Sequence, residues 1–326
     1  MLTDDQILQQ IPHTLNGTNF DLGERYEGKV RDNYTFDHEG MKKRLIVVTD
    51  RLSAFDRIIT TIPFKGQVLN QIAAFWFEET KDIMANHLIE FPDPNVVVGK
   101  ECNALPVEMV MRGYLTGVTN TSVWHHYKNG GRDFCGNVLP DDMKKDQKFD
   151  HPILTPSTKA EHGGHDESVA RENILERGVI SAEDFDIMAE ASRKLYERGV
   201  EVAARQGVIL VDTKYEFGKD ENGNIVLIDE IHTPDSSRFW FADEYQARFD
   251  AGEEQKKIDK EYLRKWLADK GFVGEGEVPE VPEDIKMETA KRYIQAFELI
   301  TGKTFEAEVG DVAGRLEGNL SKYLNS

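Results

Sequence analysis

Two strand-like runs around a short polar turn constrain the fold of this chain more than any other feature. Residues 208–217 (VILVDTKYEF) and 224–231 (NIVLIDEI) are rich in β-branched and aromatic residues, and the sequence GKDENG joins them. The pair Asn222-Gly223 favours a tight turn between antiparallel strands, because both residue types tolerate positive φ angles. We therefore predict a β-hairpin, whose register decides which side chains share a face.

The register predicts a cluster of charged side chains. If the Asn-Gly pair forms the two central turn residues, Glu216 lies directly opposite Asp229. Because strand side chains alternate, Asp212, Lys214 and Glu216 share one face, and Asp229 joins it. Two carboxylates with Cβ atoms ~5 Å apart repel each other unless a cation lies between them, which favours a divalent ion such as Mg²⁺. The alternative is a solvated face neutralised by Lys214, and a register slip of one residue would remove the argument.

Polar residues crowd the chain after this hairpin. Pro234 ends the strand, and Asp235, Ser236 and Arg238 follow in a turn where a carboxylate, a hydroxyl and a guanidinium can converge on one polar ligand. Glu230 points to the opposite face of the strand from the acids, so we expect a structural role for it.

A glycine-containing segment near the N-terminus, GKVRD, is a candidate phosphate site. It places Lys29 and Arg31 on one face of an expected strand beside Gly28, where a phosphate chain could approach closely. GK pairs are also common in ordinary turns, so the segment alone is a weak signal.

A second polar cluster follows the apolar strand at the start of VVTDRLSAFD. Asp50, Arg51, Ser53 and Asp56 gather at its end. Binding groups often collect at strand ends, but an internally satisfied turn explains the cluster equally well.

Two further segments carry candidate groups. Arg112 in MRGYLTG follows an apolar strand and precedes glycines, which suits either an anion clamp or a structural salt bridge. TPSTKAEHGGHDE holds Lys159 next to a Gly-Gly pair, which is typical of a mobile catalytic loop. Its two histidines do not predict zinc, since the glycines disfavour a helix that would align both imidazoles.

The remaining periodicity predicts a mixed structure. The first half is β-rich with one helix at about 68–80, and helices are expected at 168–177 and at 181–207, the latter capped by Ser181. The region from 253 onward falls into helical periods that end in glycine. The polar stretch 128–148 indicates a loop or a partly ordered excursion over the surface.

Taken in order, GKVRD, TDRLSAFD, RGYLTG, TPSTKAEHGGHDE, VDTKYEFG and DEIHTPDSSRFW closely resemble the motifs of the SAICAR synthetase family. Six motifs in one order over nearly the whole chain are far more specific than any of them singly. The resemblance implies an α+β fold related to ATP-grasp enzymes. It would comprise a β-rich nucleotide-binding lobe (1–111), a central α+β catalytic domain (112–246) and a C-terminal helical region (247–326) packed on the central domain.

The resemblance also implies a reaction. ATP, L-aspartate and carboxyaminoimidazole ribonucleotide (CAIR) would give SAICAR, ADP and phosphate in de novo purine biosynthesis, with Mg²⁺ as cofactor. A carboxylate oxygen is a poor leaving group, so phosphorylation by ATP would precede attack by the aspartate amine.

Residue roles follow from the matched motifs. The resemblance implies that the groups nearest the chemistry are Lys159, Asp212 and Lys214. It implies ATP contacts from Gly28, Lys29, Arg31 and Glu108, and Mg²⁺ ligation by Glu216 and Asp229. It implies substrate contacts from Ser53, Asp56, Arg112, Ser122, Asp235, Ser236 and Arg238. Ser122 is matched across an apparent four-residue insertion at 118–121. No general base stands out, with Asp212 and Asp50 as the candidates.

Composition limits the partners and the compartment. A net charge of −19 repels phosphate backbones and argues against nucleic acid or an anionic membrane as the main partner. The longest apolar run, 72–77, is too short to span a membrane, and the N-terminus is too polar for a signal peptide, so we expect a soluble, cytoplasmic protein. The two cysteines suggest neither a disulfide framework nor a metal site. A homo-oligomer is left open.

Two other classes of function share these features. A kinase of similar architecture that phosphorylates a hydroxyl would also need metal-binding carboxylates and a phosphate-loop lysine, but it would need no aspartate. A non-catalytic nucleotide-binding protein would use the same acids and lysines only to hold ATP.

Overall fold

The computed structural model describes residues 2–55, 57–119, 122–158, 167–258 and 261–326, and it is a mixture of helices and antiparallel strands, as the sequence predicts. None of the helices in these ranges is long and apolar enough to cross a membrane.

The chain forms two compact units. Unit 1 comprises Met1–Phe75, His87–Glu101 and Ile258–Ser326, and unit 2 comprises Trp76–Asn86 and Cys102–Lys257. The sequence led us to expect three regions instead of two. The C-terminal helical region belongs to the same unit as the N-terminal strands, because its last helix buries apolar side chains against their sheet.

Unit 1 is built on a five-stranded antiparallel sheet. Its strand order is β1 (Glu24–Glu27), β2 (Arg31–His38), β3 (Met41–Val48), β7 (Val96–Lys100) and β6 (Leu88–Asp93). A separate pair consists of β4 (Arg51–Ala54) and β5 (Arg57–Thr61). Along β2 every second residue is buried, including Tyr34 and Phe36, so this strand presents one apolar face to the core.

Unit 1 also contains several helices. They are α1 (Asp4–Gln10), the short 3₁₀ helix η1 (Ile11–His13), α7 (Glu261–Asp269), α8 (Glu283–Thr301) and α9 (Val312–Leu324). Helix α2 (Lys65–Glu79) begins in unit 1 and ends in unit 2. Helix α8 ends before Gly302, which adopts a left-handed conformation as expected for a terminating glycine.

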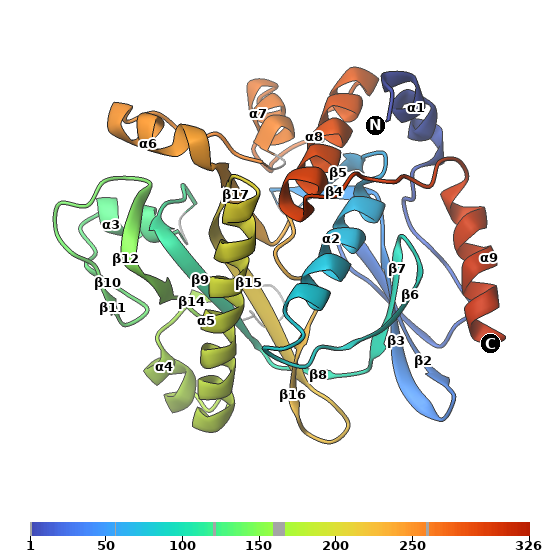
Figure 1. Cartoon of the computed structure of the whole chain (residues 1–326), viewed down its shortest axis with the longest axis horizontal. Coiled ribbons are helices and arrows are strands. Elements are labelled where there is room, and N and C mark those ends of the chain that lie inside the picture. Colours follow the sequence, from blue (N-terminus) through green and yellow to red (C-terminus); the bar gives the residue numbers. More distant parts are fainter. Residues whose placement is uncertain (1, 56, 120–121, 159–166, 259–260) are drawn as a thin grey trace. The chain divides into compact units, whose positions relative to one another are not determined.

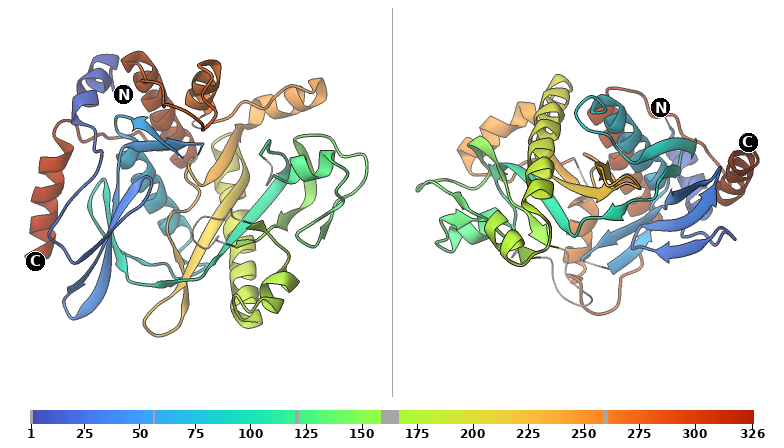
Figure 2. Two further views of the ribbon diagram at one scale, coloured as in Figure 1. Left: turned by 180° about the vertical axis from the view of Figure 1, so that it is seen from behind. Right: turned by 90° about the horizontal axis from the view of Figure 1, so that it is seen from below.

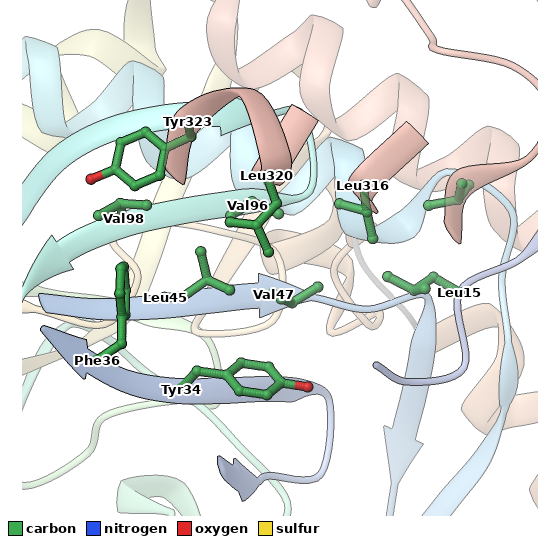
Figure 3. Packing of buried hydrophobic residues seen from close by; sticks show 11 residues of the cluster. Leu15, Tyr34, Phe36, Leu45, Val47, Val96, Val98, Leu316, Leu320 and Tyr323 are labelled. Carbon is green, nitrogen blue, oxygen red and sulfur yellow. The ribbon is translucent and has the colours of Figure 1, made fainter. Parts of the chain in front are cut away.

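Helix α9 runs alongside the sheet of unit 1 (Figure 2). Its residues Leu316, Leu320 and Tyr323 pack against the apolar side chains of β2, β3 and β7 (Figure 3). An ion pair fixes the helix further, with Arg315 Nε 2.9 Å from Asp93 Oδ2. The last twenty residues thus contribute to the core of unit 1.

Unit 2 is built on an eight-stranded sheet with β15 (Val208–Lys219) near its centre. On one path β14 (Glu167–Ser168), β13 (Ser157–Thr158), β9 (Val107–Leu115), β15 and β16 (Ile225–Ile228) lie side by side. In addition, β12 (Gln147–Leu154) pairs with β9, while β17 (Ser237–Phe241) and β8 (Asn103–Ala104) pair with β15.

Helix α5 (Ala182–Arg205) packs on β15 and β9 (Figure 1). Its N-terminus is capped as predicted, because Ser181 Oγ accepts a hydrogen bond from the Asp184 N–H at 3.0 Å. Tyr196 anchors the helix to the sheet by donating to the carbonyl oxygen of Leu210 at 2.9 Å.

Smaller elements complete unit 2. These are α3 (Val123–Lys128), the hairpin of β10 (Asp133–Phe134) and β11 (Asn137–Val138), α4 (Arg171–Glu176) and α6 (Ala242–Ala251). The stretch 128–148 is more than a solvated loop, since Phe134 and Leu139 are buried in a small apolar cluster. Helix α4 is shorter than predicted, because Glu167 and Ser168 pair as strand β14.

The hairpin of β15 and β16 forms as predicted, but its register is one residue away. Glu216 pairs with Ile228, and Lys219 pairs with Ile225. The turn differs because Asp220 caps it, accepting hydrogen bonds at Oδ1 from the N–H groups of Asn222 (3.0 Å) and Asn224 (2.9 Å). The expected Glu216–Asp229 pair across the strands is therefore wrong.

Candidate active site

A row of three charged side chains crosses the sheet of unit 2. Asp212 on β15 lies opposite Arg112 on β9 and opposite Arg238 on β17. Its Oδ2 atom is 3.5 Å from Arg112 Nη1 and 3.4 Å from Arg238 Nη1. Arg112 is buried, and its Nε donates to Thr155 Oγ1 at 2.8 Å. One carboxylate thus faces two guanidinium groups.

This row carries excess positive charge. Burial lowers the pKa of Arg112; Asp212 opposes that shift and Arg238 adds to it. A guanidinium starts from so high a pKa that it remains charged at neutral pH. The row is consequently suited to hold an anionic group of a ligand in the planar fork of donors that arginine offers.

The next charged residue along β15 is enclosed by acids. Lys214 Nζ donates to Glu108 Oε1 at 2.8 Å and to Glu216 Oε1 at 2.5 Å. Burial lowers the pKa of Lys214, but the carboxylates of Glu216 and Glu108 outweigh burial and raise it above its ordinary value. Lys214 is therefore an ammonium at neutral pH and not a proton acceptor.

The two clusters place opposite net charges at the two ends of one face of the sheet. Every second residue of this part of β15 points to the same face. As predicted, these residues are Asp212, Lys214 and Glu216. Two cations around one acid lie at the Asp212 end, and two acids around one cation lie at the Glu216 end. Such a face can bind an anion at one end and a cation at the other.

The Glu216 end offers one or two carboxylates, which is the number that Mg²⁺ typically takes from a protein. Among the described residues, no group of three or more His, Cys, Asp or Glu is placed to hold a metal ion. Asp229 follows directly after the partner of Glu216 in the hairpin and has a φ angle of 67° that turns the chain out of the strand. Mg²⁺ bound with a nucleotide typically needs only one or two carboxylates beside water and phosphate. Because Glu216 pairs with Ile228, Mg²⁺ ligation by Glu216 and Asp229 together stays a prediction.

The turn after β16 is held by its own side chains. Thr233 Oγ1 donates to Glu230 Oε2 at 2.6 Å, so Glu230 helps to hold the turn. Asp235 and Ser236 follow, and the Ser236 N–H donates to the Thr233 carbonyl at 3.2 Å. The turn leads directly into β17 and so places Arg238 beside Asp212.

His232 in this turn is a core residue. It is fully buried, and its Nε2 lies 2.6 Å from the Tyr215 hydroxyl. Burial lowers the pKa of His232 to about 3. The imidazole is therefore neutral and unsuited to proton transfer at neutral pH.

Ser122 lies close to the Asp212 end of this face. It caps α3, accepting a hydrogen bond from the His125 N–H at 3.3 Å and donating to the Thr119 carbonyl at 2.7 Å. A Cβ atom on Gly117 would lie 2.4 Å from Ser122 Cβ and 3.1 Å from Arg238 Nη1. Glycine at position 117 thus allows Ser122 and Arg238 to approach the same point.

The candidate ATP residues of unit 1 lie in a hairpin loop. Gly28 and Lys29 connect β1 to β2, and Arg31 is the first residue of β2. The Gly28 N–H donates to the Arg31 carbonyl at 2.8 Å and closes the loop. The expectation that Lys29 and Arg31 share a strand face is wrong, because the chain reverses direction between β1 and β2.

Asp50 has a structural role. It is buried, and it accepts hydrogen bonds from the N–H groups of Leu15 at 2.7 Å and Gly66 at 2.9 Å. Burial raises the pKa of Asp50 to about 6. Since both oxygens are occupied inside unit 1, Asp50 is a poor candidate for the general base.

The other expected site residues fall in two places. Ser53 is on β4, half-buried and paired with Ile58. Asp56 and Lys159, together with the His-Gly-Gly-His segment, lie outside the described residues.

Two residues at the site are not found from residue patterns alone. Thr155 orients Arg112 from a neighbouring segment, and no local pattern marks one threonine among several. Glu108 is reached only through the resemblance, although a lone acid in the apolar run VEMVM is a usable signal of function.

The charged face belongs to a mixed helix-and-strand protein that can bind an anionic group and a cation on one sheet. The sequence pattern of SAICAR synthetase matches residues 24–281. A phosphoribosylaminoimidazole-succinocarboxamide synthase of Legionella pneumophila is 45% identical over 317 residues, which are 96% of this chain and 100% of that protein. The chain therefore belongs to the SAICAR synthetase family.

Solved structures agree with this assignment. A SAICAR synthase from Saccharomyces cerevisiae complexed with SAICAR has a TM-score of 0.78 and 32% identity, covering 90% of this chain and 100% of that one. A SAICAR synthetase in complex with ADP has a TM-score of 0.64 and 26% identity, covering 87% of this chain and 100% of that one.

Proposed function

We infer that the chain is an ATP-dependent ligase that joins L-aspartate to the carboxylate of CAIR and releases SAICAR, ADP and phosphate. Family membership supports this reaction. The observation that carries it in the structure is the charged face of β9, β15 and β17, with two guanidinium groups around Asp212 at one end and two carboxylates around Lys214 at the other.

The Asp212 end, where two guanidinium groups surround one carboxylate, is proposed to hold CAIR. Arg112 and Ser122 are assigned to the ribonucleotide phosphate, while Asp235, Ser236 and Arg238 surround the remainder of the nucleotide. Lys214 lies next along the strand, so its ammonium can neutralise the imidazole carboxylate that is to be phosphorylated. Ser53 and Asp56 are assigned to substrate contacts by the matched motif alone.

The Glu216 end, where two carboxylates surround one ammonium, is proposed to hold the metal that accompanies ATP. Glu216 and Asp229 would bind Mg²⁺, which when bound neutralises charge on the phosphate oxygens. Glu108 belongs to this end, where it and Glu216 hold the Lys214 ammonium, and the resemblance assigns it to ATP. Gly28, Lys29 and Arg31 are assigned to the phosphate chain, with Lys159 reaching the transferred phosphoryl group.

Amide formation requires the CAIR carboxylate to lose an oxygen. Transfer of the γ-phosphoryl group to that carboxylate forms an acyl phosphate and releases ADP. Attack by the aspartate amine then forms the C–N bond, and phosphate departs with the carboxylate oxygen. We assign the amine proton to Asp212 rather than Asp50, because the Asp50 oxygens are held inside unit 1.

The reaction is tested by measuring ADP and SAICAR with purified protein, MgATP and CAIR, with and without L-aspartate. ADP and SAICAR should form together and only when all substrates are present. ADP formation without aspartate would indicate a kinase, and ATP binding without turnover by folded protein would indicate a nucleotide-binding protein. A cytoplasmic location remains an expectation of the sequence.

A further inference from the structure

The loop that carries Lys29 is held from inside by one buried arginine. The Arg51 side chain is only 2% exposed. Its Nε donates to the Lys29 carbonyl at 3.0 Å, and its Nη2 donates to the Gly28 carbonyl at 3.0 Å. Its Nη1 donates to the carbonyl of Asn16 at 2.7 Å. Arg51 thus directs most of its donors at backbone oxygens.

The third carbonyl of the loop is held by the same segment. Val30 accepts hydrogen bonds from Thr49 Oγ1 at 2.8 Å and from the Thr49 N–H at 3.2 Å. Three successive loop carbonyls, at residues 28–30, therefore point toward residues 49–51. In a planar trans peptide the N–H points opposite to the C=O, so the N–H groups of residues 29–31 point away from Arg51.

A carboxylate completes the arrangement. Arg51 Nη2 also donates to Asp32 Oδ1 at 2.8 Å, and the other Asp32 oxygen accepts from the Thr18 N–H at 2.6 Å. Both charged side chains are enclosed. Burying an ion pair contributes little net stability because of its desolvation cost, so its benefit is better sought in the conformation that it imposes.

We propose that Arg51 is a positioning residue for ATP. By fixing the carbonyls of residues 28–30, it sets the loop so that Lys29 and the outward N–H groups meet the phosphate chain. The inference rests on the proposed function, in that ATP is the ligand of this loop. It predicts that a change at Arg51 alters ATP binding selectively, whereas a purely structural role would change only stability.

The variant Arg51→Lys tests this. Lysine keeps the charge, but its single ammonium cannot reproduce the planar fork that spans two carbonyls and a carboxylate. We expect the KM for ATP to rise about tenfold, the loss of roughly one charge-assisted hydrogen bond, while the KM values for CAIR and L-aspartate stay within about twofold. Direct binding of MgATP, measured by calorimetry without the other substrates, should weaken by the same factor.

Arg315→Lys is the matched control. Arg315 is also a largely buried arginine of unit 1, paired with Asp93 at 2.9 Å and donating to the Glu308 carbonyl at 3.2 Å. The Arg315→Lys variant should lower Tm about as much as Arg51→Lys does, without changing the affinity for MgATP. Thr49→Val, which removes one bond to the Val30 carbonyl, provides a milder test with an expected weakening of about threefold, the effect of one neutral hydrogen bond.

The outcomes separate this inference from the proposed function. If Arg51→Lys and Thr49→Val bind MgATP as tightly as the wild type, Arg51 is merely structural and the inference is overturned. Should Arg51→Lys fail to fold, Thr49→Val alone decides. If the wild type binds MgATP but forms no SAICAR, the ligase function fails, while the binding comparison still judges Arg51.

Discussion

Replacement of Asp212 by asparagine is the sharpest perturbation of the charged row. Asparagine keeps the size of the side chain and removes the negative charge between Arg112 and Arg238. Each guanidinium nitrogen lies about 3.5 Å from Asp212 Oδ2, and a Coulomb term at an effective dielectric constant of ~20 is then about 5 kcal/mol per pair. Desolvation cancels much of that attraction. The Arg238 side chain is 32% exposed, so solvent also screens its attraction to Asp212.

The net loss in unfolding free energy should therefore be about 3 kcal/mol, at the low end for breaking a buried ion pair. For a unit of this size it corresponds to a fall in Tm of about 6–12 °C. Thermal unfolding at low ionic strength measures it. Asp82→Asn in unit 2 is the control: Asp82 is 61% exposed, its Oδ2 lies 2.9 Å from Arg198 Nη2, and its loss should cost under about 1 kcal/mol.

The anion dependence of the same melts tests the assignment of the site. Without Asp212 the two guanidinium groups lack an internal counter-ion, so inorganic phosphate should raise Tm more for Asp212→Asn than for the wild type or Asp82→Asn. Equal phosphate effects in all three proteins, or equal stability losses in both variants, would refute the view that Asp212 competes with a bound anion.

Three further predictions concern other regions of the molecule. Glu216→Gln should raise the Mg²⁺ concentration needed for half-maximal ADP formation about tenfold or more, with unchanged dependence on L-aspartate; an unaltered Mg²⁺ titration would remove Glu216 from the metal site. The raised pKa of Asp50, about 6 against 3.8 in the unfolded chain, means that the folded protein keeps this proton longer. Its contribution to stability is present below about pH 4 and lost as pH rises through 6. Urea unfolding should therefore show wild-type stability falling by about 2 kcal/mol relative to Asp50→Asn between pH 4 and 7. A pH-independent difference would contradict the buried carboxyl. Leu316→Ala should cost about 2–5 kcal/mol in urea unfolding while leaving all KM values intact, because Leu316 is buried between α9 and the sheet; a loss below about 1 kcal/mol, as for a surface residue, would deny α9 its place in the core.

The hairpin shows how far sequence reasoning reaches. The Asn-Gly pair correctly predicts two antiparallel strands, and alternation correctly places Asp212, Lys214 and Glu216 on one face. The register escapes prediction because the Asp220 side chain caps the turn, and one residue is enough to separate Glu216 from its expected partner.

Contacts between distant segments are the other limit. Arg51 and residues 28–30 are each visible as polar motifs, but nothing in their spacing shows that one guanidinium binds carbonyls of a loop far away in sequence. The enclosure of Lys214 by Glu108 depends likewise on the pairing of β9 with β15. Membership of helix α9 in unit 1 is set by packing against the sheet, which helical periodicity alone does not reveal.

We propose that the protein activates the CAIR carboxylate with ATP before aspartate attacks it. The most direct test supplies CAIR labelled with ¹⁸O in that carboxylate, together with MgATP and L-aspartate, and follows the label by mass spectrometry. We expect one labelled oxygen in the released phosphate for each SAICAR formed. Phosphate that carries no label, in a reaction that still yields SAICAR, would contradict phosphorylation of the carboxylate.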